Sequence, residues 1–252
     1  MKIGIGGVPS SAGGRRLGQE KAPEALRRAK LIEKLMKAGH EAVDYGDIGL
    51  YRYVPDTRNT KAQNKQTVMK VCSLVAGKIA GVISDGFCPL VLGGDCTIAI
   101  GSLAGIINFF PKVGLIYLDA DADLNTPETT PSGIFDGMVI AHIIGRGDRE
   151  LAHMAKRYPI LREEEIVLFG LNPTSGYVDP PEIEFLKSSP ILQFPIQVIH
   201  RKGVESAARE SLKMLESKAN KIFVHLDVDF IGRSDMPAAD IPHKTGLSFN
   251  EA

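Results

Sequence analysis

Short apolar runs alternate along this chain with longer segments in which apolar residues recur at helical spacing. Continuous runs of valine, isoleucine and leucine are typical of strands that are buried on both faces of a sheet. Apolar residues three or four positions apart predict amphipathic helices, most clearly over residues 68–83 and 204–215. This alternation predicts an α/β fold in which helices cover both faces of a parallel sheet. The expected strands are residues 2–6, 89–92, 113–118, 166–170, 196–199 and 222–226.

The length of 252 residues fits one large α/β domain or two small ones. We expect a single domain over residues 1–252, because the chain has neither an internal repeat nor a low-complexity linker. The stretches 171–181 and 231–246, rich in Gly and Pro, then form long loops of that domain. Hydrophobic residues make up 44% of the chain and aromatic residues 6%, without tryptophan, so the core should be mainly aliphatic.

Charge and cysteine content narrow the functional class. The 30 basic residues balance the 30 acidic ones, which gives no indication of a nucleic-acid groove or of a membrane-binding surface. No apolar run approaches the roughly 20 residues of a membrane-spanning helix, and residues 1–6 have the pattern of a strand, not of a signal peptide. The 3 cysteines make no even disulfide framework, so we expect a cytoplasmic protein in a reducing compartment.

Aspartate side chains follow three of the predicted strands directly. Strand 89–92 leads into Gly93-Gly94-Asp95-Cys96-Thr97, strand 113–118 into Asp119-Ala120-Asp121-Ala122-Asp123, and strand 222–226 into Asp227-Val228-Asp229. Side chains alternate along extended backbone, so the three aspartates of the second motif should share one side, as should the two of the third. In open parallel sheets, sites form beyond the carboxyl ends of the strands, where all three motifs lie.

The carboxylates of the second and third motifs would repel one another severely if they met without compensation. Buried charges need partners or metal ions, and no Lys or Arg lies inside the motifs. Sites dominated by carboxylates suit Mn²⁺, Mg²⁺ or Ca²⁺, and a pair of such ions can generate hydroxide near neutral pH. The plainer alternative, that each Asp-x-Asp is a solvated turn or a helix cap, is weakened because two such motifs and a Gly-Gly-Asp all follow apolar strands.

The motifs resemble those of the ureohydrolase family, which comprises arginases, agmatinases and formiminoglutamases. That family carries Gly-Gly-Asp-His-Ser, then Asp-Ala-His-Ala-Asp-x-Asn, then Ser-x-Asp-x-Asp, in the same order and with comparable separations. The N-terminal Gly6-Gly7-Val8-Pro9, the stretch 125–133 and the loop 237–247 are similar to further parts of the family pattern. The resemblance therefore spans nearly the whole chain.

The resemblance implies a three-layer α/β/α fold with a mostly parallel sheet of eight strands, the last of which is expected to be missing from this sequence together with the rest of the family's C-terminal segment. It also implies two Mn²⁺ ions, a small cationic guanidino or amidino substrate, and a homo-oligomer, often a trimer or hexamer. Asp119 and Asp227 would bridge the ions, with Asp123 and Cys96 completing one shell and Asp121 and Asp229 the other. The positions expected to contact substrate are Asn125, Thr130 and Ser132.

This sequence departs from the family where histidines are expected. Cys96 replaces the ligand His of the first motif, Asp121 replaces that of the second, and Asp136 replaces a His that is thought to shuttle protons. Extra anionic ligands would weaken the metals as Lewis acids. Cys96 either coordinates, which would favour Zn²⁺ or Fe²⁺, or packs as a small neutral residue. Asp136 either replaces the shuttle, beside Asp123 as the second catalytic carboxylate, or is a loop residue.

Two further departures concern the substrate. The segment 171–176 carries none of the carboxylates that hold the amino-acid part of arginine in arginases, and Asp179 is the nearest one. The sequence also ends before the Glu that holds the guanidinium in the family. Two histidines outside the motifs can each be interpreted in two ways. His225 is either a core residue or a metal ligand, and His243 is either a loop residue or part of the rim of the site.

The sequence therefore predicts a metal-dependent hydrolase that cleaves a C–N bond of a guanidino or amidino compound, with agmatine-like or guanidino-acid substrates favoured over arginine. The alternative is a catalytically silent subunit that keeps the fold and acts in binding or assembly, for which the lost histidines argue. The changes to Cys and Asp, which can both bind metal, favour the hydrolase.

Overall fold

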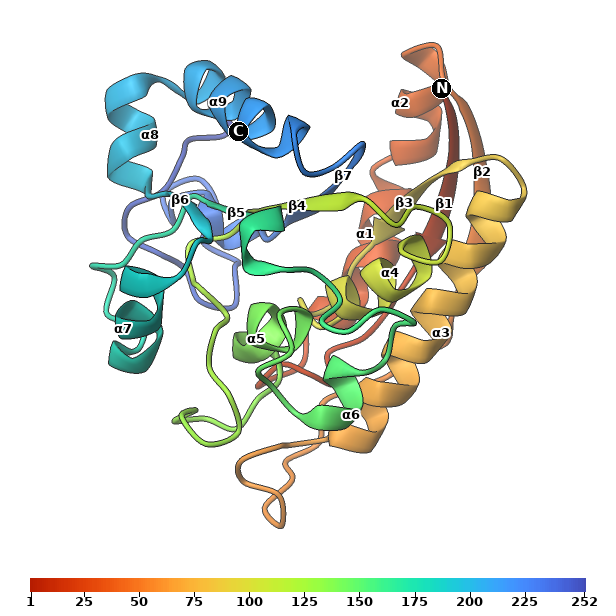
Figure 1. Cartoon of the computed structure of the whole chain (residues 1–252). Helices are drawn as coiled ribbons and strands as arrows, with labels where there is room; N and C mark the ends of the chain where they lie inside the picture. The colour runs from red at the N-terminus through yellow and green to blue at the C-terminus, as the bar shows by residue number, and fades with distance from the viewer. The chain divides into compact units, whose positions relative to one another are not determined.

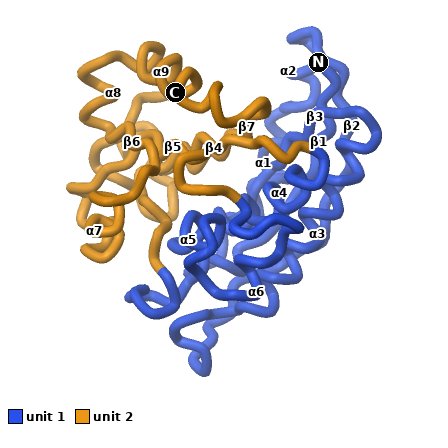
Figure 2. Tube along the Cα trace, viewed as in Figure 1, with its two compact units in different colours: residues 1–109, 126–160 blue, residues 110–125, 161–252 orange.

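The computed structural model describes residues 1–252, which divide into two compact units (Figure 2). Unit 1 consists of residues 1–109 and 126–160, and unit 2 of residues 110–125 and 161–252. Each unit contains its own sheet, and every strand pair in both sheets is parallel. The α/β class with parallel strands, predicted from the alternation of apolar runs and helical patterns, is confirmed.

Unit 1 is built on a three-stranded sheet in the order β2-β1-β3 (Figure 1). The strands are β1 (Lys2–Gly7), β2 (Glu41–Asp47) and β3 (Cys88–Leu92). The helices of this unit are α1 (Ala22–Arg28), α2 (Leu31–Lys37), α3 (Lys65–Ser84), α4 (Ile98–Ile106), α5 (Val139–Ile143) and α6 (Arg149–Ala152).

Glycines allow the helices of unit 1 to pack closely. A Cβ atom at Gly4 of β1 would lie 2.5 Å from Val82 of α3, so the absent side chain lets the helix approach the sheet. A Cβ atom at Gly101 of α4 would lie 2.4 Å from the backbone oxygen of Cys72 of α3. Both are far below van der Waals contact, so larger residues would push these elements apart.

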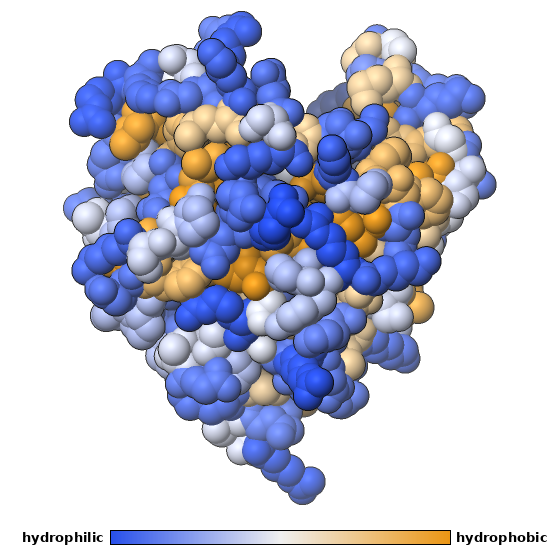
Figure 3. Space-filling model, in the orientation of Figure 1, coloured by the Kyte–Doolittle hydropathy of each residue, from blue (hydrophilic) through white to orange (hydrophobic).

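Helix α3 has 20 residues, and a window of 18 of them has a mean hydropathy of 1.5, so the helix is long and apolar enough, by length and composition, to cross a membrane. The expectation that no segment approaches this length was therefore wrong. A helix from the core of a globular unit passes the same test, and one face of α3 is buried and packs against α4 and the sheet. Hydrophilic side chains cover much of the surface that is seen in Figure 3.

Unit 2 is built on a four-stranded sheet in the order β6-β5-β4-β7. The strands are β4 (Val113–Leu118), β5 (Ile166–Phe169), β6 (Leu192–Phe194) and β7 (Lys221–Leu226). The helices are α7 (Pro180–Ser188), α8 (Ile196–Lys202) and α9 (Val204–Glu216). A core of aliphatic and phenylalanine side chains, among them Ile116, Phe169 and Phe230, holds sheet and helices together, in line with the predicted aliphatic core.

The register of this sheet brings two of the predicted motifs to one level. Leu118, the last residue of β4, pairs with Leu226, the last residue of β7. The backbone N–H of Asp227 donates to the carbonyl of Leu118 at 2.8 Å. Asp119 and Asp227 therefore both leave the sheet at the same edge, as expected for the carboxyl ends of adjacent parallel strands.

Most predicted strands form, but residues 196–199 were wrongly predicted as a strand. They form the first turn of α8, which begins after Pro195 with a φ of −59°, a value that suits the entry to a helix. The neighbouring strand β6 is only three residues long and was missed, as was β2, whose residues are largely polar or exposed. The chain forms 7 strands, in sheets of three and four, where the family resemblance implied eight.

Candidate metal centre

Five carboxylates gather at the end of β4 and β7, all within unit 2. Asp119, Asp123 and Asp229 are buried, with exposed fractions of 4%, 7% and 6%. The two motifs are linked directly, because the backbone N–H of Ala120 donates to the Asp229 Oδ1 at 3.2 Å. The sequence prediction that these two Asp-x-Asp motifs meet is confirmed.

Within each motif the first carboxylate accepts a hydrogen bond from the backbone two residues later. The N–H of Asp121 donates to Asp119 Oδ1 at 2.7 Å, and that of Asp229 donates to Asp227 Oδ1 at 2.9 Å. These bonds fix one oxygen of each first carboxylate. Asp123 is held differently: its backbone has a φ of +49°, and the hydroxyl of Tyr117 donates to its Oδ2 at 2.5 Å.

Burial and mutual repulsion raise the pKa of Asp119 and that of Asp229 well above the ordinary carboxyl value. Burial is the larger cause in both, and the neighbouring aspartates of the cluster add to it. The ionised cluster is therefore unfavourable unless positive charge compensates it. A divalent cation is the compensation that oxygen ligands of this kind are suited to accept.

His225 on β7 joins the cluster from the strand itself. Its ligand atom lies within 4.8 Å of those of Asp119 and Asp227, and its ring stacks on that of Tyr117 with centroids 4.3 Å apart. Its Nε2 has no hydrogen-bond partner. This nitrogen therefore does not fit the interpretation of His225 as a core residue whose ring is hydrogen-bonded. Burial lowers the pKa of His225 to about 3, which keeps the imidazole neutral and able to bind a metal.

His243 joins the cluster from the long loop after β7. It is fully buried, and its Nε2 lies 3.2 Å from Asp121 Oδ1 and 3.8 Å from Asp229 Oδ2. The three ligand atoms are close enough together to hold one ion. Imidazole nitrogens and carboxylate oxygens in buried positions, several of them without hydrogen-bond partners, fit a divalent transition metal. The position of His243 in sequence, 14 residues after Asp229, gave no periodic signal for this placement.

The remaining predicted metal ligand and the predicted proton shuttle belong to unit 1 and contact each other there. The backbone N–H of Cys96, just before α4, donates to Asp136 Oδ1 at 2.7 Å, and Gln19 Nε2 donates to Asp136 Oδ2 at 3.4 Å. Asp136 thus anchors the start of α4. Cys96 is buried and forms no disulfide bond.

Of the three predicted substrate contacts, Thr130 and Ser132 lie in one turn of unit 1. The Thr130 hydroxyl oxygen accepts from the backbone N–H of Ser132 and of Gly133, at 3.2 and 2.9 Å, while its carbonyl accepts from Lys61 Nζ at 2.6 Å. These bonds hold the turn in place. Ser132 is exposed.

Asn125, the third predicted contact, lies in unit 2 beside Asp179, to which the sequence analysis gave no role. Its Nδ2 donates to Asp179 Oδ2 at 2.7 Å, and the N–H of Leu124 donates to Glu182 Oε1 at 2.7 Å. Asp179 and Glu182 form a capping box at the start of α7. The pattern Asp-Pro-Pro-Glu, a helix start signal, could have revealed that these carboxylates are ordered. Burial raises the pKa of Glu182 to about 7.

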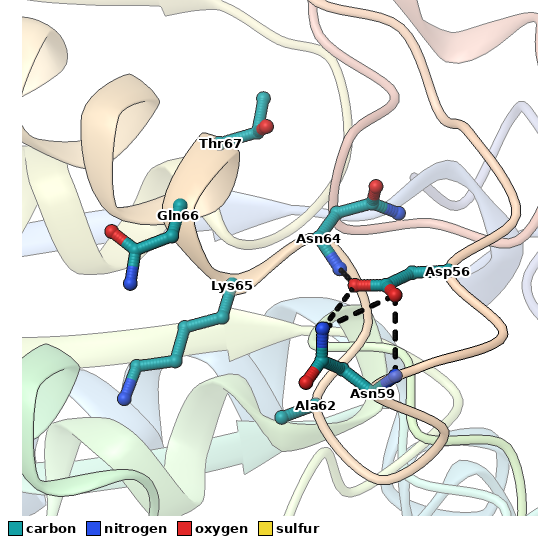
Figure 4. A pocket seen from close by; sticks show the side chains of 7 residues that line it. All are labelled: Asp56, Asn59, Ala62, Asn64, Lys65, Gln66 and Thr67. Atoms are coloured by element: carbon teal, nitrogen blue, oxygen red, sulfur yellow. Dashed lines mark hydrogen bonds between the residues drawn. The ribbon is translucent and has the colours of Figure 1, made fainter.

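A pocket of about 290 Å³ lies in unit 1 at the start of α3 (Figure 4). Asp56 is one of its lining residues and accepts hydrogen bonds from the side chain of Asn59 and from the backbone of Asn64. None of the predicted site residues lines it. We assign it no part in the metal chemistry.

Comparison with known proteins agrees with the motifs. The model of the arginase family matches residues 1–252. The chain is 32% identical to the arginase of Bacillus caldovelox, with 99% of this chain and 83% of that protein covered. It is 34% identical to human arginase-1, with 99% and 77% covered.

Solved structures give the same result. The crystal structure of arginase from Bacillus cereus matches with a TM-score of 0.89 and 35% identity, covering 99% of this chain and 82% of that one. Formimidoylglutamase from Bacillus subtilis matches with a TM-score of 0.77 at 20% identity, which shows the shared fold. The family's members are metal-dependent hydrolases of guanidino and amidino compounds. With its motifs, its fold and its full-length match, the chain belongs to the arginase family.

Proposed function

We propose that this chain hydrolyses a C–N bond of a small guanidino or amidino compound with the help of two divalent metal ions. Mn²⁺ is the ion that we expect first. The observation that carries the proposal is the buried cluster of carboxylates and imidazoles in unit 2. Such a cluster is costly to keep without cations. Bound divalent ions supply Lewis acidity and lower the pKa of water toward neutrality.

The proposed ligands follow the family pattern by position. Asp119 and Asp227 would serve both ions, Asp123 and Cys96 would complete one shell, and Asp121 and Asp229 would complete the other. If the Cys96 thiolate coordinates, Zn²⁺ or Fe²⁺ would compete with Mn²⁺. Asp123 accepts a proton during hydrolysis, and the Tyr117 hydroxyl at 2.5 Å fixes one of its oxygens. Asp136 is proposed as the second proton-transferring carboxylate.

The proposed substrate carries a positive charge at each end. The guanidinium or amidine end faces the carboxylate cluster, and Asn125, Thr130 and Ser132 contact the rest. The hydrogen bond between Asn125 and Asp179 supports an additional cationic group at the tail, since it puts a carboxylate next to a proposed contact. A cationic tail favours agmatine, which carries an amine at that end. Arginine was disfavoured because segment 171–176 carries no carboxylates, and the position of Asp179 weakens that argument.

Assembly and location complete the proposal. We expect a homo-oligomer, a trimer or hexamer, in the cytoplasm. Light scattering of the purified protein tests the assembly state, and a monomer would contradict it.

The test of the function is a substrate panel. Protein loaded with Mn²⁺ is incubated with agmatine, arginine, guanidinobutyrate, guanidinopropionate and formiminoglutamate, and urea, formamide and ammonia are measured. We expect one of these products from at least one compound, and agmatine is the first candidate. The control is the Asp119→Ala/Asp227→Ala variant, which should be inactive.

Equal background product from the two proteins on every compound would contradict the hydrolase. That result would favour the alternative of a catalytically silent subunit, which the loss of the expected histidines motivates.

A further inference from the structure

His243 is a buried imidazole without hydrogen bonds. Its exposed fraction is 0%, and neither Nδ1 nor Nε2 has a hydrogen-bond partner. Buried polar atoms are nearly always paired in folded proteins, and each exception needs an explanation. An ion or water that binds the nitrogen is the usual one.

The orphaned nitrogen points at two carboxylates of the cluster. Nε2 lies 3.2 Å from Asp121 Oδ1 and 3.8 Å from Asp229 Oδ2, and Asp121 Oδ1 has no hydrogen-bond partner either. Two ligands at about 2.1 Å from one metal ion lie roughly 3 to 4.2 Å apart, depending on the angle between them. Both separations from His243 fall within this range, and the ligand atoms of the three residues lie within 4.8 Å of one another, close enough to hold one ion.

The charge of the cluster also favours a metal ion. Five aspartates gather at this site, and buried carboxylates are tolerated when positive charge compensates them. A divalent ion held by carboxylates and an imidazole supplies two positive charges.

The position of His243 relative to the family motif indicates what this imidazole replaces. The second motif of the family carries a His where this chain has Asp121, so the imidazole is missing from the strand end. Here an imidazole reaches the same carboxylate pair from the loop after β7. We propose that His243 is a nitrogen ligand of the metal held by Asp121 and Asp229, and that it replaces the imidazole lost at position 121.

The proposal deepens the metal site on which the proposed function rests, but its readout is metal binding and not catalysis. Metal-free protein is titrated with Mn²⁺, and free Mn²⁺ is followed by electron paramagnetic resonance. We expect two bound ions per wild-type chain and at least tenfold weaker binding of one of them in His243→Ala. In Asp121→His/His243→Ala, which returns the imidazole to the strand end, the affinity should recover to within about threefold. His200→Ala, which removes an exposed imidazole of the same unit, should bind Mn²⁺ as the wild type does.

A role in which His243 only orients Asp121 would also weaken binding, so a second readout is needed. Pulsed electron paramagnetic resonance of the Mn²⁺-loaded protein counts the nitrogens coupled to the metal. The count should fall by one in His243→Ala, or in His243→Gln if the alanine variant does not fold. An unchanged count, or unchanged affinity in both variants, would overturn the assignment of His243 alone. A wild-type protein that binds no Mn²⁺, Zn²⁺ or Fe²⁺ would overturn it together with the metal-dependent function.

Discussion

At the scale of single residues, the structure is dominated by aspartates that are kept close together in a buried place. Burial and the charges of the neighbouring aspartates raise the pKa of Asp119 well above the ordinary carboxyl value. Such a site costs stability in the metal-free protein, which is a common feature of functional sites.

Asp119→Asn is expected to stabilise the metal-free protein, by about 1 kcal/mol, since the amide replaces a carboxyl group whose ionisation is unfavourable there and keeps an oxygen that can accept from the N–H of Asp121. The same variant should lose most of the rise in melting temperature that Mn²⁺ gives the wild type. Thermal unfolding with and without Mn²⁺ measures both effects. Glu216→Gln, at an exposed carboxylate at the end of α9, is the control. A metal-free Asp119→Asn protein that melts below the wild type would contradict the repulsion.

His142 gives a separate prediction about pH. Its Nδ1 lies 2.6 Å from the carbonyl of Met138, and its Nε2 accepts from the N–H of Asp148 at 2.9 Å. Burial lowers its pKa to about 4 from the ordinary 6.5. The unfolded chain therefore binds a proton more readily than the folded one, so this contribution to stability is complete above pH 6.5 and is lost as the pH falls toward 4.

Between pH 6.5 and 4 the metal-free wild type should lose about 2 to 3 kcal/mol more stability than His142→Gln. Urea unfolding at several pH values measures this difference, and the comparison cancels the opposite trend of the raised aspartates. Parallel pH profiles for the two proteins would show that His142 does not carry the effect.

At the scale of helices and strands, the close contact of α3 with α4 depends on a missing side chain. Gly101→Ala would place a Cβ atom 2.4 Å from the backbone oxygen of Cys72. We expect a loss of about 1 to 3 kcal/mol, since the backbone of one helix must move. The matched control is Gly77→Ala on α3, where a Cβ would meet nothing within 4 Å. That variant should gain up to about 1 kcal/mol from helix propensity. Denaturant unfolding of both separates packing from propensity, and equal effects of the two would contradict the packing argument.

The elements that the sequence predicted well are those whose pattern is decided locally. The buried strands β4 and β5 consist mainly of Val, Ile and Leu, and α3 and α9 carry a clear apolar stripe. The wrongly predicted segment 196–199 is also apolar, but Pro195 and a short strand before it turn it into a helix. An apolar run alone does not distinguish a strand from a helix. The length of the segment and the flanking proline do so here.

At the scale of the whole molecule, the positions of the aspartates could be predicted, because motifs after parallel strands must meet at one edge of a sheet. The placement of His243 could not be predicted in the same way. It lies in an irregular loop, without a periodic pattern, and reaches Asp121 through tertiary folding. The same holds for Asp179, which the capping box of α7 brings to Asn125.

The metal-dependent function rests on the binding of divalent ions by the carboxylates and imidazoles of unit 2. A crystal structure of the Mn²⁺-soaked protein, with anomalous diffraction recorded at the manganese edge, tests it most directly. We expect two anomalous peaks roughly 3.5 Å apart, one of them bound by Asp121, Asp229 and a nitrogen of His243. The absence of any peak within reach of these side chains at saturating Mn²⁺ would contradict it.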